Sequence, residues 1–572
     1  MRRSILVLCT ILAVLRMSAQ WRFEGDTTPT WETVIDRYAE FARTRSGVAL
    51  LEIGRDDDGS PIHLFVLADG SGTTPDSIRA AGKNILWITN GIHPGEPDGV
   101  DASLLLAQAL LDSDQYMGLL ANTAVCIVPV YNVSGAKQRS ATGRVNQNGP
   151  QEYGFRANAR NLDLNRDFIK ADAANTRSLI DALNTWDPDI YFETHVSNGA
   201  DHQYVMELLT THPDKLDTNL RHFMQDHLVP RQYEWMEQRG HRMCPYFETH
   251  RDIPEQGLAG FMDGPRYSTG YNALRQRIGV LSESHMLKPY ADRVNATFEL
   301  MLATLAAMNE HPDALREARS KARISAVEQV VHHTNWRIDT TAVDRLPWLG
   351  YAADTATSAV SGLPRWLYHR DRPTNVEVPW LNTGVPELRI ERPVAYLIPQ
   401  AWHEVIDRLR LDGVPMEVLS AKHRFVGEVQ RITAYGGSGR PYEGHYLHRD
   451  VEVAIQVDTV LAKPGDVLVP MGHATDALVM EILEPRAADS FFAWGFFDAI
   501  LQQKEWFIDF VFEDIAADLL RNDPVLAEEL RAERERDPAF ANDAWAQLYF
   551  VYRRSPYFEP GYERYPVFRI TQ

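Results

Sequence analysis

The sequence predicts an α/β layer fold for residues 30–310, followed by a mixed α+β region. Short apolar runs alternate with segments of helical periodicity, which is typical of strands and helices arranged in layers. The runs are apolar at consecutive positions, as in a sheet that is covered on both faces. We expect strands at 62–68, 85–89, 124–130, 190–194, 204–208 and 278–281, and helices at 99–111, 173–185, 216–228 and 293–308.

The character of the sequence changes near residue 310, where a charged helical stretch begins. Beyond residue 345 the chain contains Pro- and Val-rich pieces at 374–379 and 450–457, and then a helical section near 489–530. We therefore predict four parts, which are a signal peptide at 1–19, a first domain at 20–310, a helical linker at 311–344 and a C-terminal accessory region of unassigned role at 345–572.

The composition narrows the class of protein. The 572 residues are 44% hydrophobic and include 13 Trp, which favours packed cores over disorder. This length is sufficient for two or three domains. The formal net charge is −20, and the chain has no basic stripe that would neutralise phosphates. Nucleic acid is therefore not expected as a partner.

The N-terminus has the pattern of an export signal. Arg2-Arg3 precedes an apolar run at 5–15, which is too short to span a bilayer. The tripeptide Met17-Ser-Ala19 ends in small residues suited to cleavage before Gln20. We expect a periplasmic or secreted protein with no stable membrane insertion after the signal is cleaved.

Two cysteines, Cys126 and Cys244, lie beyond the predicted signal peptide. Cys126 is inside an apolar run, which favours a buried thiol. A disulfide between the two is possible in an oxidising compartment, and the sequence leaves that alternative open.

A histidine and a glutamate lie three residues apart in a turn between a predicted strand and a predicted helix. The turn is Gly91-Ile-His-Pro-Gly-Glu-Pro-Asp-Gly99. In open α/β sheets, ligands bind beyond the carboxyl ends of the strands. His93 and Glu96 can therefore converge on one metal ion, although an isolated pair with this spacing is more often a surface or capping feature. A catalytic zinc takes three protein ligands, so we expect the third from another strand end.

Two copies of Phe-Glu-Thr-His offer that third ligand. His195 ends the run Asp189-Ile-Tyr-Phe-Glu-Thr-His195, which has the character of a strand. His250 ends the second copy in a less regular segment. We prefer His195, and we expect His250 at the surface or in a pocket lining.

The polar segment between residues 156 and 167 contains candidate anion-binding groups. Asp163 and Asn165 lie two apart, so they would face one way on an extended segment. Arg166 can hold a carboxylate with two parallel hydrogen bonds, and Asn165 can add a donor. Arg156 is a candidate for polarising a carbonyl oxygen. An exposed charged loop is the alternative interpretation, but it does not explain the two leucines inside the segment.

A glutamate near the end of a predicted strand is the candidate general base. Glu283 follows the apolar run at 278–281, so its carboxyl group would be partly desolvated. Desolvation raises a carboxyl pKa, which suits a group that accepts a proton from water and passes it to a leaving amine. Taken alone, this segment favours a structural role, in which the Glu283 carboxylate is hydrogen-bonded by the backbone or paired with Arg277. Only together with the other motifs is the general base the preferred interpretation.

These motifs, in this order, resemble the zinc carboxypeptidase family typified by carboxypeptidase A. The most specific part is Asp163-Leu-Asn-Arg166 combined with the earlier His93-x-x-Glu96. The resemblance covers about residues 30–310. It implies a mixed, mostly parallel sheet sandwiched between helices, and one Zn²⁺ per chain.

The resemblance also implies a role for each candidate residue. It implies that zinc is bound by His93, Glu96 and His195, and that the substrate's terminal carboxylate is bound by Asn165 and Arg166. It also implies that Arg156 polarises the scissile carbonyl and that Glu283 transfers the proton. Asp163 would orient the first zinc histidine. The family carries a mobile substrate-binding tyrosine before the base, and Tyr267 and Tyr271 both qualify. The segment Thr194-His-Val-Ser-Asn-Gly199 departs from the usual form around the third ligand.

The implied activity is hydrolysis of the C-terminal peptide bond of peptides or proteins by promoted-water attack. In that scheme zinc polarises the carbonyl and the water, Glu283 deprotonates the water, and Arg156 helps to stabilise the oxyanion. Two alternatives stay open. The same scaffold can serve a cell-wall peptide endopeptidase or an amidohydrolase of the aspartoacylase and succinylglutamate desuccinylase group. The chain can also be a catalytically silent secreted binding protein.

Overall fold

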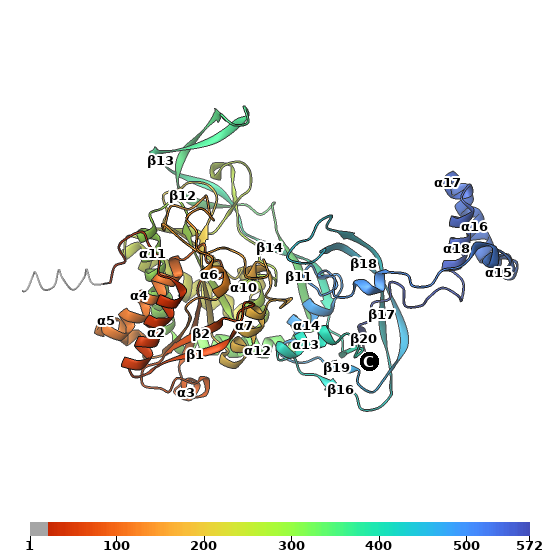
Figure 1. Ribbon diagram of the computed structural model, residues 1–572, viewed down its shortest axis with the longest axis horizontal. Helices are drawn as coiled ribbons and strands as arrows, with labels where there is room; N and C mark the ends of the chain where they lie inside the picture. The colour runs from red at the N-terminus through yellow and green to blue at the C-terminus, as the bar shows by residue number, and fades with distance from the viewer. Residues whose placement is uncertain (1–20, 572) are drawn as a thin grey trace, which may run out of the picture.

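The computed structural model describes residues 21–571, so the predicted signal peptide at 1–19 lies outside the described residues. The first half of the chain forms a layered body of sheet and helices, and the second half forms a mainly β body with a separate helical group at its far end (Figure 1). The predicted α/β fold followed by a mixed α+β region is confirmed. Within residues 21–571, no helix is both long and apolar enough to cross a bilayer.

An eight-stranded mixed sheet forms the centre of the first half. Its strand order is β1-β2-β4-β3-β5-β10-β6-β7. The four neighbours β4, β3, β5 and β10 are parallel, whereas β1–β2, β2–β4 and β10–β6 are antiparallel pairs. The bounds are β1 (Val48–Arg55), β2 (Pro61–Leu67), β3 (Asn84–Thr89), β4 (Thr123–Val128), β5 (Ile190–Ser197), β6 (Met206–Thr210), β7 (Met243–Pro245) and β10 (Ile278–His285).

Both faces of this sheet are covered, because successive residues of each central strand point into different cores. Trp87 of β3 packs into a core shared with α7 and the C-terminal region, while its neighbours Leu86 and Ile88 pack with helices on the other face. The helices of the first half are α2 (Trp31–Thr44), α3 (Pro75–Ala80), α4 (Asp98–Asp112), α5 (Asp114–Met117), α6 (Val133–Lys137), α7 (Ala174–Trp186), α8 (Thr218–Phe223), α9 (Val229–Gln238), α10 (Ser268–Leu274) and α11 (Tyr290–Glu310).

The expected strands and helices lie close to the observed ones, and the differences have local causes. β5 and β10 continue beyond their apolar runs into polar residues, because neighbouring strands pair with them on both sides. β1 was not predicted, because its half-exposed side chains interrupt the apolar pattern. Cys126 and Cys244 are both buried and unpaired, so the structure favours free thiols over the disulfide that the sequence left open.

The second half of the chain adds a long hairpin and a second sheet. The hairpin of β12 (Asp344–Thr357) and β13 (Pro364–Leu381) pairs with two short strands of the first half, β9 (Leu258–Ala259) and β8 (Glu248–Thr249). The segment predicted as a linker contains α12 (Pro312–Glu328) and β11 (Val331–Ile338). The six-stranded sheet has the order β16-β19-β15-β20-β17-β18. The remaining bounds are β14 (Gly384–Glu391), β15 (Ala395–Ile398), α13 (His403–Leu411), β16 (Glu417–Val418), β17 (His423–Gly437), β18 (His448–Ala462), β19 (Val467–Pro470), α14 (Asp476–Leu483), α15 (Asp509–Asn522), α16 (Pro524–Arg536), α17 (Pro538–Ala541), α18 (Ala544–Arg553) and β20 (Phe568–Ile570).

Asp187 links the amino ends of β5 and β10 to α12. It directly follows α7 in the left-handed conformation, with φ of 46°. Its carboxylate lies 3.3 Å from Arg277 and 2.5 Å from Arg319, and it also contacts Arg323. Burial alone would raise the pKa of Asp187, but these three arginines hold it well below its ordinary value. Asp187 is therefore ionised at neutral pH and neutralises buried guanidinium groups.

We predict that Asp187→Asn destabilises the protein by about 3 kcal/mol, because buried arginines lose their charge partner. Asn tolerates the left-handed conformation, so the backbone adds little to this loss. Since the folded-state pKa of Asp187 is depressed, its contribution is complete above the ordinary Asp pKa and declines as the pH falls below about 4. Thermal unfolding measured against pH checks this. Asp181→Asn, an exposed change on α7, is the control, and equal midpoints for the two variants would contradict the prediction.

Candidate active site

The carboxyl ends of three parallel strands bring the sequence-predicted residues together. β3 leads into the turn that carries His93 and Glu96, and the Glu96 N–H donates to the His93 carbonyl at 2.8 Å. β5 carries His195 and β10 carries Glu283, and these two residues are direct partners in the parallel register. Their side chains therefore project from the same face of the sheet.

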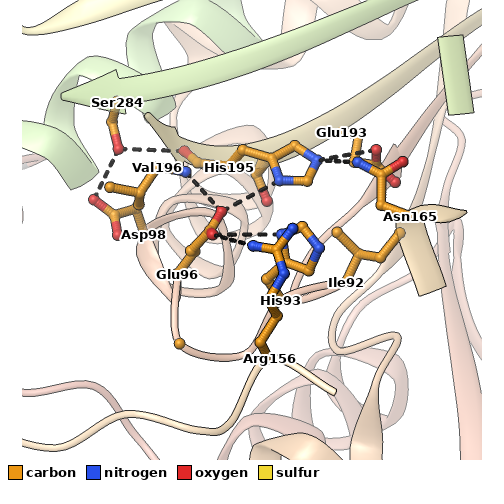
Figure 2. A network of polar contacts seen from close by, with 12 residues as sticks. Ile92, His93, Glu96, Asp98, Arg156, Asn165, Glu193, His195, Val196 and Ser284 are labelled. Carbon is orange, nitrogen blue, oxygen red and sulfur yellow. Dashed lines mark hydrogen bonds and ion pairs between the residues drawn. The ribbon is translucent and has the colours of Figure 1, made fainter. Parts of the chain in front are cut away.

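His93, Glu96 and His195 form one buried cluster (Figure 2). The Nδ1 of His93 lies 3.4 Å from Oε1 of Glu96, and the Nδ1 of His195 lies 3.2 Å from Oε2 of Glu96. Two ligands bound at ordinary distances to a tetrahedral zinc lie about 3.3 Å apart. The His93 Nδ1 is buried without a hydrogen-bond partner, so it is free to act as a ligand. The two nitrogens and one carboxylate fit a zinc ion.

A carboxylate holds the second ring nitrogen of each histidine. The Nε2 of His93 is 2.9 Å from Oδ1 of Asp163, and the Nε2 of His195 is 3.1 Å from Oε2 of Glu193. Such contacts fix the ring orientation of metal-binding histidines. The role of Glu193 was not predicted, although it stands two residues before His195 on β5 and therefore on the same face.

An ion pair and a backbone hydrogen bond hold the Glu96 carboxylate in place. It accepts hydrogen bonds from Arg144 at 2.6 Å and from the Val196 N–H at 2.8 Å. Burial would raise the pKa of Glu96, but the charges of Arg144 and His93 lower it well below its ordinary value. The role of Arg144 was not predicted from the sequence, because this residue lies in a loop without a recognisable motif. Only the folding of the chain brings it next to Glu96.

The cluster contains more buried carboxylates than cations. Burial, the largest influence, raises the pKa of Glu283 to about 8, and the Glu96 and Glu207 carboxylates add to the effect while His195 opposes it. Burial would lower the pKa of His195, but the surrounding carboxylates, first that of Glu283, raise it to about 10. This excess of negative charge favours a bound cation.

A cavity of about 250 Å³ opens beside the cluster. Asn165, Arg166, Arg156 and Tyr267 line it together with the three candidate ligands and Glu283. The Arg166 guanidinium lies 4.4 Å from the centre of the Tyr267 ring, a cation–π contact that positions the charged group. An arginine and an amide side by side at such a wall can bind a carboxylate.

Arg156 is the most exposed of these lining groups, with 42% of its side chain accessible. Its guanidinium donates to Asp163 at 2.9 Å from Nε and lies 3.5 Å from Glu96. Arg156 therefore joins the carboxylate that orients His93 to the mouth of the cavity.

Two sequence candidates lie away from the cavity. Tyr271 is fully buried and its hydroxyl donates to Asp412 of the C-terminal region at 2.5 Å, so the structure does not bring it to the lining. His250 is exposed beside β8, so it is His195 that lies next to His93. The lining residues that the sequence did not indicate are Val196, Ser197, Asn198, Leu209, Tyr246, Glu248, Phe261, Thr269 and Leu281.

Residues 36–253 match the family model of the zinc carboxypeptidases. Carboxypeptidase 2 of Trichophyton rubrum is 24% identical over 492 residues, which cover 82% of this chain and 85% of that protein. Among solved structures, a metallo-carboxypeptidase from Burkholderia cenocepacia is similar over 50% of this chain and 70% of its own, with 17% identity and a TM-score of 0.37. Carboxypeptidase A from Helicoverpa armigera covers 56% of this chain and 81% of its own, with 14% identity and a TM-score of 0.37.

Helix α4 approaches β5 closely just after the Glu96 turn. A Cβ built on Gly99 would lie 1.9 Å from Oγ1 of Thr194, the residue before His195. The Thr194 hydroxyl in turn donates to Asn90 at 3.1 Å. Any side chain at position 99 therefore separates the element that carries Glu96 from the strand that carries His195.

We predict that Gly99→Ala lowers the free energy of unfolding by about 1–3 kcal/mol, as overpacking in a core does. The matched control is Gly118→Ala, because a Cβ on exposed Gly118 meets nothing within 4 Å. The control is expected to stay within about 0.5 kcal/mol of wild type. Denaturant unfolding of the three proteins measures both effects, and a Gly99→Ala protein as stable as the control would refute the close approach.

Proposed function

We propose that this chain, whose residues 36–253 match the family model of the zinc carboxypeptidases, removes the C-terminal residue of peptides as an exported zinc metallocarboxypeptidase. One observation carries the proposal. The candidate ligands, the acid Glu283 and the carboxylate-binding pair Asn165 and Arg166 all line one cavity. The peptide bond next to a terminal carboxylate can therefore lie beside the metal site.

His93, Glu96 and His195 would hold one zinc ion, with Asp163 and Glu193 fixing the histidine rings. Bound zinc supplies a Lewis acid that polarises the scissile carbonyl and makes a water molecule more acidic. The strong ion pair between Arg144 and Glu96 keeps that carboxylate ionised, which is the form that binds a metal.

Glu283 moves the proton in this proposal. Its carboxylate accepts a proton from the attacking water and delivers it to the nitrogen of the departing amino acid. Attack of the water forms the new carbon–oxygen bond and moves the carbonyl electron pair onto the carbonyl oxygen. The carbon–nitrogen bond then breaks as that electron pair returns, and the proton lost by the water ends on the leaving amine. Arg156, which lines the same cavity, stabilises the negative charge that develops on the carbonyl oxygen.

Asn165 and Arg166 select a substrate that ends in a free carboxylate. The Arg166 guanidinium is held by its contact with the Tyr267 ring, and its Nη1 donates to the Asn165 carbonyl at 2.7 Å. A preorganised guanidinium loses little freedom when it binds a carboxylate. Export rests on the N-terminal pattern at 1–19, which directs the enzyme to the periplasm or outside the cell.

We predict that His195→Ala removes one equivalent of zinc relative to wild type, because it deletes a ligand of the cluster. His250→Ala is the matched control, since this exposed histidine ends the same four-residue motif, and it should leave the zinc content unchanged. Elemental analysis of the purified proteins after dialysis gives the counts. Loss of zinc in the His250→Ala variant alone would overturn the ligand assignment.

We predict that Arg166→Gln lowers kcat/KM for a peptide with a free C-terminus by about 10- to 100-fold. This is the loss expected when a hydrogen bond to a charged group, here the substrate's terminal carboxylate, is removed. Hydrolysis of the same peptide with an amidated C-terminus is slow in both proteins and does not change. Arg160→Gln is the control, because Arg160 donates to the Asp172 carbonyl instead of lining the cavity.

Either of two results with substrates would replace the proposed carboxypeptidase activity with another activity. Equal cleavage of free and amidated peptides by wild type would indicate an endopeptidase. Release of acyl groups from N-acyl amino acids without peptide cleavage would indicate an amidohydrolase.

A further inference from the structure

A second cluster of histidine and carboxylate side chains lies next to the candidate active site, outside its cavity. His202 precedes β6, Glu207 lies on β6, and His285 ends β10. One potential ligand atom from each lies within 4.8 Å of the others. All three side chains are at most 1% exposed. None of them lines the cavity that holds Glu283.

The register of the sheet produces this second cluster. Glu207 of β6 pairs with Glu283 of β10, and His285 stands two residues further along β10 on the same face. On the other side of β10, Ser197 of β5 pairs with His285, and its hydroxyl donates to Glu207. Glu207 therefore lies in the row that contains His195 and Glu283, and His285 lies about 7 Å further along the strands.

Hydrogen bonds within the protein do not satisfy these buried groups. The Nδ1 of His202, both ring nitrogens of His285 and the Oε2 of Glu207 have no hydrogen-bond partner. A buried polar atom without a partner is unfavourable, and native structures contain few of them. The single hydrogen bond between His202 and Glu207 leaves the other groups unexplained.

The spacing of the donor atoms suits a metal ion. The Oε1 of Glu207 is 3.0 Å from Nε2 of His202 and 3.6 Å from Nδ1 of His285. These distances bracket the separation of about 3.3 Å between ligands of a tetrahedral zinc. The two imidazole rings stack with centroids 4.0 Å apart, so both rings lie beside the Glu207 carboxylate.

The surroundings of the cluster resemble the outer shell of a metal site. The Oδ1 of Asp201 is 3.7 Å from Nε2 of His285, on the ring edge opposite Glu207, while Arg370 of β13 holds the other Asp201 oxygen at 2.6 Å. Trp348 of β12 packs on the His202 ring at 5.4 Å. The hairpin of the C-terminal region thus covers the cluster with an indole and fixes a carboxylate beside it. The nearby Lys288 ammonium donates to the carbonyl oxygen of His202 and is not directed at the ligand atoms.

We propose that His202, Glu207 and His285 form a second metal site that binds a divalent transition-metal ion such as Zn²⁺. Two imidazole nitrogens and one carboxylate are the donor set that such ions prefer over Ca²⁺ or Mg²⁺. The ion joins the β5–β6 connection, β6 and β10 beneath the β12–β13 hairpin. It is buried outside the catalytic cavity, so it holds these elements together and does not contact the substrate.

The zinc content of the purified protein tests this proposal. Wild type, equilibrated with Zn²⁺ and dialysed, is expected to hold about two zinc ions per chain. His285→Ala and Glu207→Gln should each retain about one, which remains in the catalytic cluster. His332→Ala is the matched control, because His332 is a buried histidine paired with Glu481 at 2.9 Å, and it should retain both ions.

Anomalous diffraction from wild-type crystals tests the second site even if a substitution prevents the variant from folding. Crystals of wild type measured on both sides of the zinc absorption edge should show an anomalous peak between His202 and His285, separate from any peak at His195. One zinc per chain, lost with His195→Ala, and no anomalous peak beside His202 would overturn the second site alone. A peak beside His202 without one at His195 would instead overturn the proposed catalytic metal and leave the second site standing.

Discussion

The parallel pairing of β5 with β10 is the constraint on which the rest of the site depends. It sets His195 beside Glu283, and the antiparallel partner β6 adds Glu207 to the same row. Because side chains alternate between the two faces, a slip of one residue in this pairing would turn either His195 or Glu283 away from the cavity. Burial of the central strands on both faces makes such a slip costly, since each face packs against its own core.

Charge is the second constraint, and it follows from the first. Strand ends that converge in a buried place bring Glu96, Glu193 and Glu283 close together, which is unfavourable in a medium of low dielectric constant. Arg144 offsets part of that charge through Glu96. The remaining carboxylate charge raises the pKa of His195, and it adds to the effect of burial in raising the pKa of Glu283. A metal cation offsets the same charge directly, so the electrostatics and the ligand geometry favour the same occupant.

The sequence predicts the layered fold well because each central strand contains a run of consecutive apolar residues. The pair His93 and Glu96 is also accessible from sequence, since both lie in one short turn after a strand. Arg144 and Glu193 are not, because their importance depends on which distant segment they meet after folding. Tyr267 and Tyr271 illustrate the same limit, since they lie four residues apart and yet one reaches the cavity and the other the core. The half-exposed edge strand β1 carries no apolar run that would reveal it.

The C-terminal region takes part in building the site, although its sequence contains no catalytic motif. It shares one continuous hydrophobic core with α7 and the central sheet. Its residue Glu443 accepts a hydrogen bond from the Asp163 N–H at 2.8 Å, and Asp163 in turn orients His93. Its hairpin covers the cluster that contains His202, whose partner Glu207 faces Glu283 across the strands. The two halves therefore support both sides of the cavity together, and a first half without the second would leave Asp163 without its backbone partner and the core of α7 exposed.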